Sequence, residues 1–358
     1  VLYSVSGVAA QRIMLVGLGP ATDFTPAVLR DALEASLRQV ASSGARDALL
    51  ALPLAEADTG LYDVARDIAI TAGTAVYRFD KMKSRPDAPT HPLKRISVMA
   101  TGTSDARTLR KGLEHGRAIS AGMDVARDLA NLPGNICTPT YLADQARRLS
   151  RGVKKMRVQV LDEKAMEKLG MGALLSVSRG SRQPASLICL EYRGGRPRER
   201  PVALVGKGLT FDAGGISLKP AAEMDEMKHD RCGGASVLGA LKACAQLEPP
   251  IHVVGLGPAP ENPPDGDANN PADIVTSMSG QTIEILNTDA EGRLILCDTL
   301  TYAERFKPAA VVDIATLTGA CIVALGHHAS GLFATDDGLA DALTTAGQRT
   351  GDRAWRLP

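Results

Sequence analysis

Short apolar runs alternate with amphipathic, helix-like runs along almost the whole chain. Near the N-terminus, an apolar run at 12–16 precedes a helical pattern that opens with Thr25 and Pro26, an N-cap residue followed by a proline at the first helical position. Further strand-like runs stand at 48–52 and 96–100, with another helical pattern between them. Alternation of this kind favours sheets covered by helices, so we expect an α/β fold.

One long helical pattern divides the chain. Apolar residues keep helical spacing from about Thr108 to Asn131, and no strand-like run flanks this stretch. We therefore expect two α/β domains, a small N-terminal domain at 1–107 and a larger one at 134–358, joined by a long helix at 108–133. The strands expected in the larger domain lie at 158–161, 186–192, 202–205, 252–256, 282–286 and 309–314, and its helices at 234–246, 290–305 and 340–346.

Composition argues against several classes of protein. The 358 residues include 41 Lys and Arg against 40 Asp and Glu, so a net charge of +1 gives no overall electrostatic signal for nucleic acid or an anionic membrane. No apolar run approaches the roughly 20 residues that a membrane helix needs. The six cysteines form no C-x-x-C pair, which in a chain of this size indicates a reduced, cytoplasmic protein.

Charged residues gather where predicted strands end. The strand at 202–205 runs into the glycine-rich segment 206–215, the strand at 282–286 runs into 287–293, and Asp230 stands just before a predicted helix. Ligands of open α/β sheets bind at the carboxyl ends of strands. Carboxylates gathered there repel one another unless cations neutralise them, and a pair of divalent ions about 3.5–4 Å apart suits hydrolysis. The alternative for each cluster taken alone is ordinary surface charge.

Several motifs resemble the leucyl aminopeptidase family of metallopeptidases. The most specific is the octapeptide Asn-Thr-Asp-Ala-Glu-Gly-Arg-Leu at 287–294. The likeness extends to Gly-Lys-Gly and Phe-Asp within 206–212, to Ser-Leu-Lys-Pro at 217–220, and to Asp230 with the glycines that follow it. It covers the chain beyond the N-terminal domain, which matches only in general architecture. The resemblance implies a catalytic domain with a mixed central sheet flanked by helices.

The resemblance also implies two divalent metal ions per subunit. The five implied ligands are Lys207, Asp212, Asp230, Asp289 and Glu291. All except Asp289 would bind one ion, and Asp212, Asp289 and Glu291 would bind the other, so Asp212 and Glu291 would bridge the pair. Lys207 would lose its proton on coordination. Oxygen ligands with one amine are compatible with Zn²⁺ or Mn²⁺, with Mg²⁺ or Co²⁺ as alternatives.

Further side chains match positions that act on the substrate. Lys219 matches a lysine that polarises the scissile carbonyl and stabilises the oxyanion. Arg293 matches an arginine that holds a bicarbonate ion, which carries the proton taken from the attacking water. The positions that would line the pocket for the N-terminal side chain are Met227, Thr316 and Gly319.

The activity implied by the resemblance is release of N-terminal residues, leucine among them, from peptides with a free N-terminus by attack of a metal-bound hydroxide. The family's homohexamers imply the same assembly here. One alternative is a DNA-binding or regulatory protein that retains the peptidase fold, which the net charge disfavours. Another is an inactive structural homologue, which the intact motifs disfavour. Family members continue past the point matching 355–358, and the chain starts without Met, so we expect a fragment lacking the extreme N-terminus and the C-terminal part of the catalytic domain.

Three residues near these motifs depart from the pattern or invite another interpretation. Arg231 stands where the resemblance predicts an apolar residue, and it adds a positive charge beside the Asp230 ligand. His229 could bind zinc, but the family has an unrelated side chain at its position. Cys297 has no base near it in the sequence, so we interpret it as a small buried apolar residue.

Overall fold

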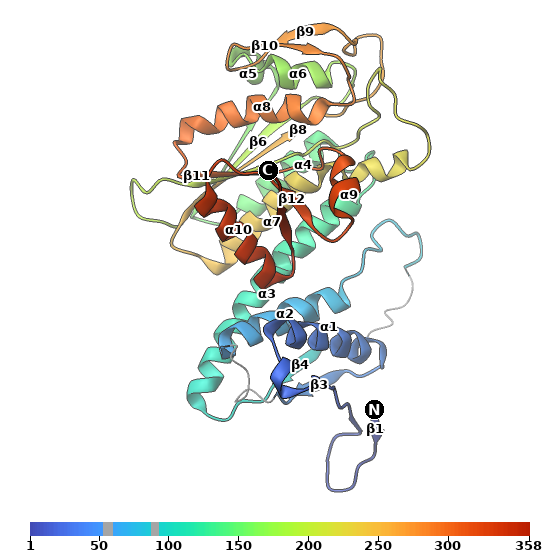
Figure 1. Cartoon of the computed structure of the whole chain (residues 1–358), viewed down its shortest axis with the longest axis vertical. Helices are drawn as coiled ribbons and strands as arrows, with labels where there is room; N and C mark the ends of the chain where they lie inside the picture. The colour runs from blue at the N-terminus through green and yellow to red at the C-terminus, as the bar shows by residue number, and fades with distance from the viewer. Residues whose placement is uncertain (53–59, 87–92) are drawn as a thin grey trace. The chain divides into compact units, whose positions relative to one another are not determined.

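Figure 1 shows the computed structural model, which describes residues 1–52, 60–86 and 93–358 of the chain. These residues form two compact units, Val1–Ser120 with His327–Pro358, and Ala121–Gly326. None of the helices in the described ranges has the length and apolar character that a membrane span requires. The domain limits at 1–107, 108–133 and 134–358 stay a prediction.

The first unit has a small apolar core under two helices. Helices α1 and α2 pack on each other, and their buried Leu29, Leu33, Val64 and Ile68 form that core. Thr25 accepts a hydrogen bond from the backbone N–H of Val28, which confirms the predicted helix cap. Strands β3 and β4 pair in parallel, as do β12 and β13. The elements of this unit are β1 (Leu2–Tyr3), β2 (Arg12–Ile13), η1 (Ala21–Asp23), α1 (Pro26–Ser42), β3 (Asp47–Leu50), α2 (Leu61–Val76), β4 (Arg95–Val98), the N-terminal part of α3 (Thr103–Asn131), β12 (Ser330–Leu332), α10 (Asp337–Thr350) and β13 (Ala354–Arg356).

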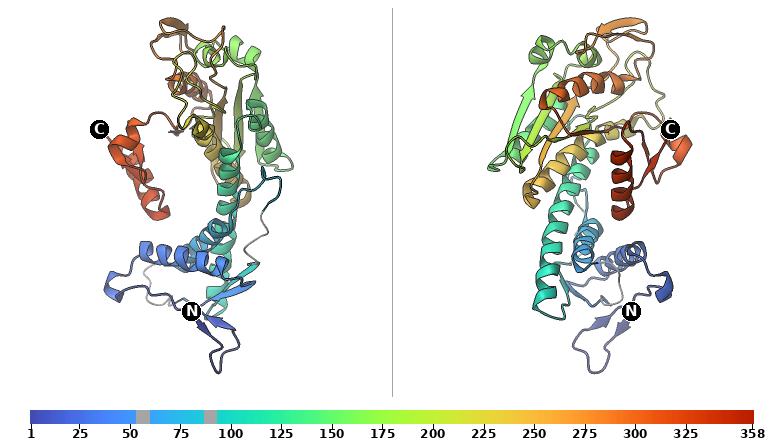
Figure 2. Two further views of the ribbon diagram at one scale, coloured as in Figure 1. Left: turned by 90° about the vertical axis from the view of Figure 1, so that its right-hand side faces the viewer. Right: turned by 60° about the vertical axis from the view of Figure 1, so that its left-hand side comes forward.

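The second unit is built on a five-stranded sheet in the order β11-β7-β8-β6-β5. Strands β11, β7 and β8 run parallel, whereas β6 and β5 are antiparallel to their neighbours, so the predicted mixed central sheet is confirmed. Helices α4 and α7 pack on one face and α8 on the other (Figures 1 and 2). The elements of this unit are the C-terminal part of α3, α4 (Pro139–Ser150), β5 (Met156–Leu161), α5 (Glu163–Lys168), α6 (Gly172–Ser178), β6 (Ser186–Arg193), β7 (Val202–Gly206), η2 (Met224–Arg231), α7 (Cys232–Leu247), β8 (His252–Ala259), β9 (Asp273–Thr276), β10 (Thr282–Ile285), α8 (Glu291–Ala303), η3 (Glu304–Phe306), β11 (Ala310–Ile314) and α9 (Ala320–Leu325).

The sequence explains why the central strands lie where they do. Strand β8 is buried along almost its whole length, as expected of a parallel strand covered by helices on both faces. Its neighbour β6 alternates between the two faces, so Leu187 and Cys189 join the core formed with α6 and α8. Most predicted strands and helices are recovered, with shifts of a few residues at several ends. The run at 12–16 forms only the two-residue strand β2, and Leu15 is exposed. Hairpin strand β9 was not predicted, because its exposed Ile274 and short length give no core pattern.

Two glycines let β7, β11 and α7 meet at the carboxyl end of β7. A Cβ atom on Gly206 would lie 2.3 Å from the Gly233 carbonyl oxygen. A Cβ atom on Gly233 would lie 2.0 Å from the Ile314 carbonyl oxygen and 2.8 Å from the Lys207 nitrogen. These distances are shorter than any van der Waals contact, so only glycine fits. The close approach matters for the site because Lys207 directly follows β7 and Thr316 lies two residues after β11. Asp230 lies two residues before α7.

We predict that Gly233→Ala destabilises the protein by about 1–3 kcal/mol, the usual cost of overpacking a tightly packed interior. Alanine has a higher helix propensity than glycine, so propensity alone would stabilise the variant. A net loss of stability would therefore come from the overlap with the Ile314 carbonyl oxygen. Urea unfolding followed by circular dichroism measures the change. Gly266→Ala is the control, since a Cβ atom there has nothing within 4 Å. Equal stability of the two variants would contradict this account of the strand-end contact.

Candidate metal centre

Three acidic side chains from separate segments meet at the carboxyl end of β7. Asp212 lies in the loop after β7, Asp230 lies next to last in η2, and Glu291 is the first residue of α8. One carboxylate oxygen from each lies within 4.8 Å of the other two, and all three side chains are buried. The structure thus brings together three of the five ligands that the family resemblance implies.

Lys207 lies between two of these carboxylates. Its Nζ atom is 2.8 Å from Asp230 Oδ2 and 2.7 Å from Glu291 Oε1, and it donates to the Thr316 carbonyl oxygen at 3.0 Å. Its side chain is only 3% exposed. Burial lowers the pKa of Lys207, but the charges of Asp230 and Glu291 outweigh that effect, so the net shift is upward.

Lys219 completes the cluster on its more open side. Its Nζ atom is 2.8 Å from Asp212 Oδ2 and 2.5 Å from Asp289 Oδ1. The side chains of Lys219 and Asp289 are 20% and 33% exposed, far more than those of Lys207 and Glu291. All five implied ligands and Lys219 therefore form one network that is buried at one end and reaches solvent at the other.

Negative charge exceeds positive charge within this network. Four carboxylates face two lysines, and burial raises the pKa of Glu291 to about 7, with Asp212 and Asp230 contributing to the same shift. Burial likewise raises the pKa of Asp230. The N-termini of α7 and α8 lie next to Asp230 and Glu291, where the positive end of each helix favours an anion. Bound cations would offset the remaining repulsion.

The carboxylate oxygens themselves fit the role of metal ligands. Within the described residues, Glu291 Oε2 is buried and has no hydrogen-bond partner. Asp230 Oδ2 and Asp289 Oδ1 are also buried and receive no well-directed hydrogen bond, although a lysine lies close to each. Buried polar atoms in proteins are nearly always satisfied, so these oxygens point to a ligand. Hard oxygen donors with one amine suit Mn²⁺, Mg²⁺ and Zn²⁺.

Asn262 is a functional candidate that the sequence analysis missed. It is 5% exposed, and its Nδ2 group donates to Asp212 Oδ1 at 2.9 Å and to the Thr288 carbonyl oxygen at 3.1 Å. Its backbone forms an isolated bridge with Asp212. The signal that could have found it is its place just after β8, since β8 ends beside β7 at the same edge of the sheet.

Hydrogen bonds between loops hold the other ligands. Thr288 donates to the Gly214 carbonyl oxygen at 2.6 Å and accepts from the Ser217 N–H at 2.8 Å, which ties the loop of Asp212 to that of Asp289. The Thr316 hydroxyl donates to Asp230 Oδ1 at 2.5 Å. Thr316 was predicted to line a substrate pocket. In the structure its hydroxyl contacts Asp230, one of the residues implied to bind metal.

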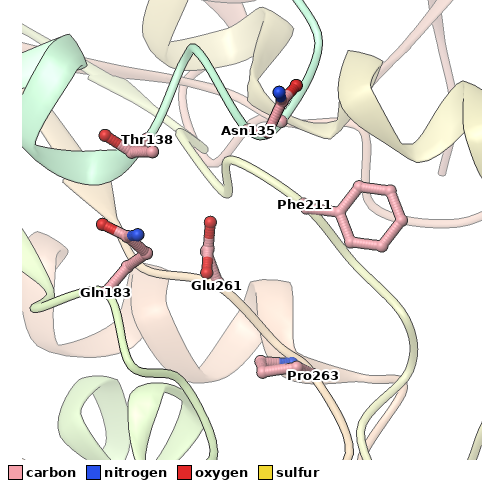
Figure 3. Close-up of a pocket in the computed structure, with 7 residues that line it drawn as sticks. Asn135, Thr138, Gln183, Phe211, Glu261 and Pro263 are labelled. Carbon is pink, nitrogen blue, oxygen red and sulfur yellow. The ribbon is translucent and has the colours of Figure 1, made fainter.

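The remaining predicted residues are less buried than the three clustered carboxylates. Arg293 is exposed on α8, Met227 is half-buried on η2, and Gly319 is exposed just before α9. A hollow of about 310 Å³ opens beside Phe211 and Glu261, the chain neighbours of Asp212 and Asn262 (Figure 3). Its lining residues are Gly134, Asn135, Thr138, Gln183, Phe211, Glu261 and Pro263. The predicted pocket residues Met227, Thr316 and Gly319 are not among them.

Comparison with known proteins identifies relatives of both parts of the chain. Residues 1–86 match the N-terminal domain and residues 124–358 the catalytic domain of the cytosol aminopeptidase family. The probable cytosol aminopeptidase of Nitrosococcus oceani is 52% identical over 358 residues, which are 100% of this chain and 72% of that protein. That of Bordetella petrii is 54% identical over 363 residues, covering 100% and 73%. The solved bottromycin maturation enzyme BotP in complex with Mn superposes with a TM-score of 0.85 at 39% identity, covering 96% of this chain and 72% of that chain.

We predict that Asn262→Ala weakens divalent metal binding about 10–100-fold, the usual effect of losing a hydrogen bond that orients a ligand. The reason is that, among the described residues, Asp212 Oδ1 would keep only its bond from the Gly214 N–H. Titration of Mn²⁺ into metal-free protein measures the affinity. Asn269→Ala is the control, because Asn269 is equally buried and its Oδ1 atom has no partner among the described residues. Equal affinities for the two variants would show that Asn262 does not orient Asp212.

Proposed function

The chain belongs to the cytosol aminopeptidase family, and we propose that it removes N-terminal residues from peptides with the aid of two divalent metal ions. The resemblance found in the motifs is confirmed by these matches, and with it the class of the enzyme, a metallo-aminopeptidase. The observation that carries the two-metal proposal is the buried network around Asp212, Asp230 and Glu291, in which carboxylates outnumber lysines.

We assign the two ions to overlapping sets of ligands. Lys207 and Asp230 would bind only the ion at the buried end of the network, and Asp289 would bind only the ion at the end that reaches solvent. Asp212 and Glu291 would bind both ions. This assignment agrees with the gradient of exposure from Lys207 to Asp289. Zn²⁺ or Mn²⁺ fits the donor set, with Mg²⁺ or Co²⁺ as alternatives, and the complex of the related BotP with Mn supports manganese.

The exposure of the two lysines separates their roles. Divalent ions bound here would supply Lewis acidity toward the amine and the scissile carbonyl, and would lower the pKa of a water molecule to near neutrality. Lys207 is itself buried and lies between the buried carboxylates of Asp230 and Glu291, which suits a ligand. Lys219 reaches solvent beside Asp289, so its Nζ atom can donate to the oxyanion that forms on a substrate carbonyl. Arg293, exposed near Glu291, would hold a bicarbonate ion that takes up a proton.

The substrates we propose are peptides with a free N-terminus, leucine among the residues released. Met227, Thr316 and Gly319 would line the pocket for the N-terminal side chain, within a catalytic domain at 134–358. We further propose a homohexamer in the cytoplasm. A DNA-binding or regulatory role has less support, since the formal net charge is only +1.

The metal assignment is tested with Glu291→Gln. This substitution keeps the shape of the side chain but removes a charge shared by both ions, so we expect bound metal and activity to fall together. Metal content after dialysis, measured by atomic emission, and turnover of leucine amide give the two readouts. Glu163→Gln is the matched control, because Glu163 accepts a backbone N–H at 3.0 Å in the same unit. Two ions per chain and wild-type turnover in Glu291→Gln would rule out the bridging role.

The substrate class is tested by blocking the amine. We expect leucine amide to be cleaved and N-acetyl-leucine amide to be left essentially intact at the same pH and metal concentration. Acetylation delocalises the lone pair of the nitrogen and adds bulk at the network, so the advantage of precise positioning is lost, which is worth up to about 7–11 kcal/mol. Release of ammonia measures both reactions. Comparable kcat/KM values would mean that the enzyme accepts internal peptide bonds.

A further inference from the structure

Arg231 is the largest fully buried side chain of the described residues, with a relative exposure of 0%. No carboxylate within the described residues forms an ion pair with it. Its guanidinium donates instead to backbone carbonyl oxygens: Nε to Leu129 at 2.8 Å, Nη1 to Thr210 at 2.7 Å, and Nη2 to Leu132 and, at 3.4 Å, to Ala130. A buried charge paired only with carbonyls is unusual, because burial normally requires a counter-charge.

The position of these carbonyls explains why the charge is tolerated. Leu129 and Ala130 belong to the last turn of α3, where helix carbonyls have no partner within the helix. The C-terminus of a long helix also carries partial negative charge, which favours a cation. Arg231 therefore satisfies the end of α3 and draws its own compensation from the helix dipole.

The same guanidinium connects α3 to the two segments that bear metal ligands. Thr210 stands two positions before Asp212, in the loop after β7, and Arg231 itself directly follows Asp230. One planar group thus fixes the loop of Asp212 and the backbone at Asp230 against the end of the same helix. A flexible apolar side chain at 231 could fill the space, but it could not hold these carbonyls in a fixed arrangement.

We propose that Arg231 is a positioning residue for the metal centre, which sets the separation of Asp212 and Asp230 by clamping both segments to the C-terminus of α3. The inference rests on the proposed metal-dependent function. Arg231 does not touch metal or substrate in this role, and acts through the backbone of Thr210 and of Asp230. Its loss should therefore weaken metal binding by more than the loss of an equivalent carbonyl-bound arginine elsewhere.

The test compares Arg231→Ala and Arg231→Lys with Arg200→Ala as the matched control. Arg200 also donates to two carbonyl oxygens, those of Lys307 at 2.9 Å and Pro308 at 2.6 Å, but it is exposed. Binding of Mn²⁺ to metal-free protein is followed by electron paramagnetic resonance, and unfolding of the metal-free protein by circular dichroism. Each titration is repeated with guanidinium ion below denaturing concentrations and with urea as its uncharged counterpart.

We expect Arg231→Ala to weaken Mn²⁺ binding about 10–100-fold, as other losses of ligand support do. Guanidinium, but not urea, should restore most of the affinity, because the free ion can occupy the same carbonyls. Arg231→Lys should show an intermediate loss, since one ammonium cannot reach all four oxygens, and Arg200→Ala should bind Mn²⁺ as the wild type does.

Wild-type Mn²⁺ affinity in Arg231→Ala or Arg231→Lys, with only a lowered unfolding temperature, would overturn the proposal and leave Arg231 a stabilising residue. The proposal would also be overturned if guanidinium restored the unfolding temperature of Arg231→Ala but not its Mn²⁺ affinity. If Arg231→Ala does not fold, Arg231→Lys decides the question. Wild-type protein that binds no Mn²⁺, or Glu291→Gln that binds it normally, would instead overturn the proposed function, whatever the Arg231 variants do.

Discussion

Mutual repulsion among buried carboxylates is the constraint around which the end of strand β7 is organised. Asp212, Asp230 and Glu291 are each at most 7% exposed, so water screens their charges poorly. The protein counters this repulsion with Lys207, Lys219 and the N-termini of α7 and α8. The arrangement is one that divalent cations complete, and it gives the family assignment a physical basis.

Backbone packing makes this concentration of charge possible. Gly206 and Gly233 let two strands and a helix approach to distances that no side chain would permit, so ligands from separate segments can share one small volume. Asn262, Thr288 and Thr316 then fix individual ligand segments through hydrogen bonds. The centre is therefore set by two kinds of contact, steric at the glycines and directional at the amide and hydroxyl groups.

The sequence predicted the fold well wherever local patterns carry the information. The cap at Thr25 accepts the expected backbone N–H group, and the apolar runs of the central sheet stand where they were expected. It could not predict short elements with little buried surface, such as the exposed helix α9. The motifs predicted the cluster, but its supporting residue Asn262 is recognisable only once β8 is known to lie beside β7. The sequence suggested that Arg231 adds a positive charge beside the metal ligand Asp230. In the structure its guanidinium instead donates hydrogen bonds to backbone carbonyl oxygens at the C-terminal end of α3.

The parallel pairing of β7 with β11 has a consequence for how the molecule forms. Lys207 and Thr316 are 109 positions apart in the chain, and Arg231 and Leu129 are 102 apart, yet both pairs are in direct contact. Contacts between such distant positions close large loops, and topologies rich in them fold slowly. No single hairpin or helix pair contains the centre. Competence to bind metal should therefore arise late in folding, together with the last strands of the sheet, and would report that the second unit has reached its native state.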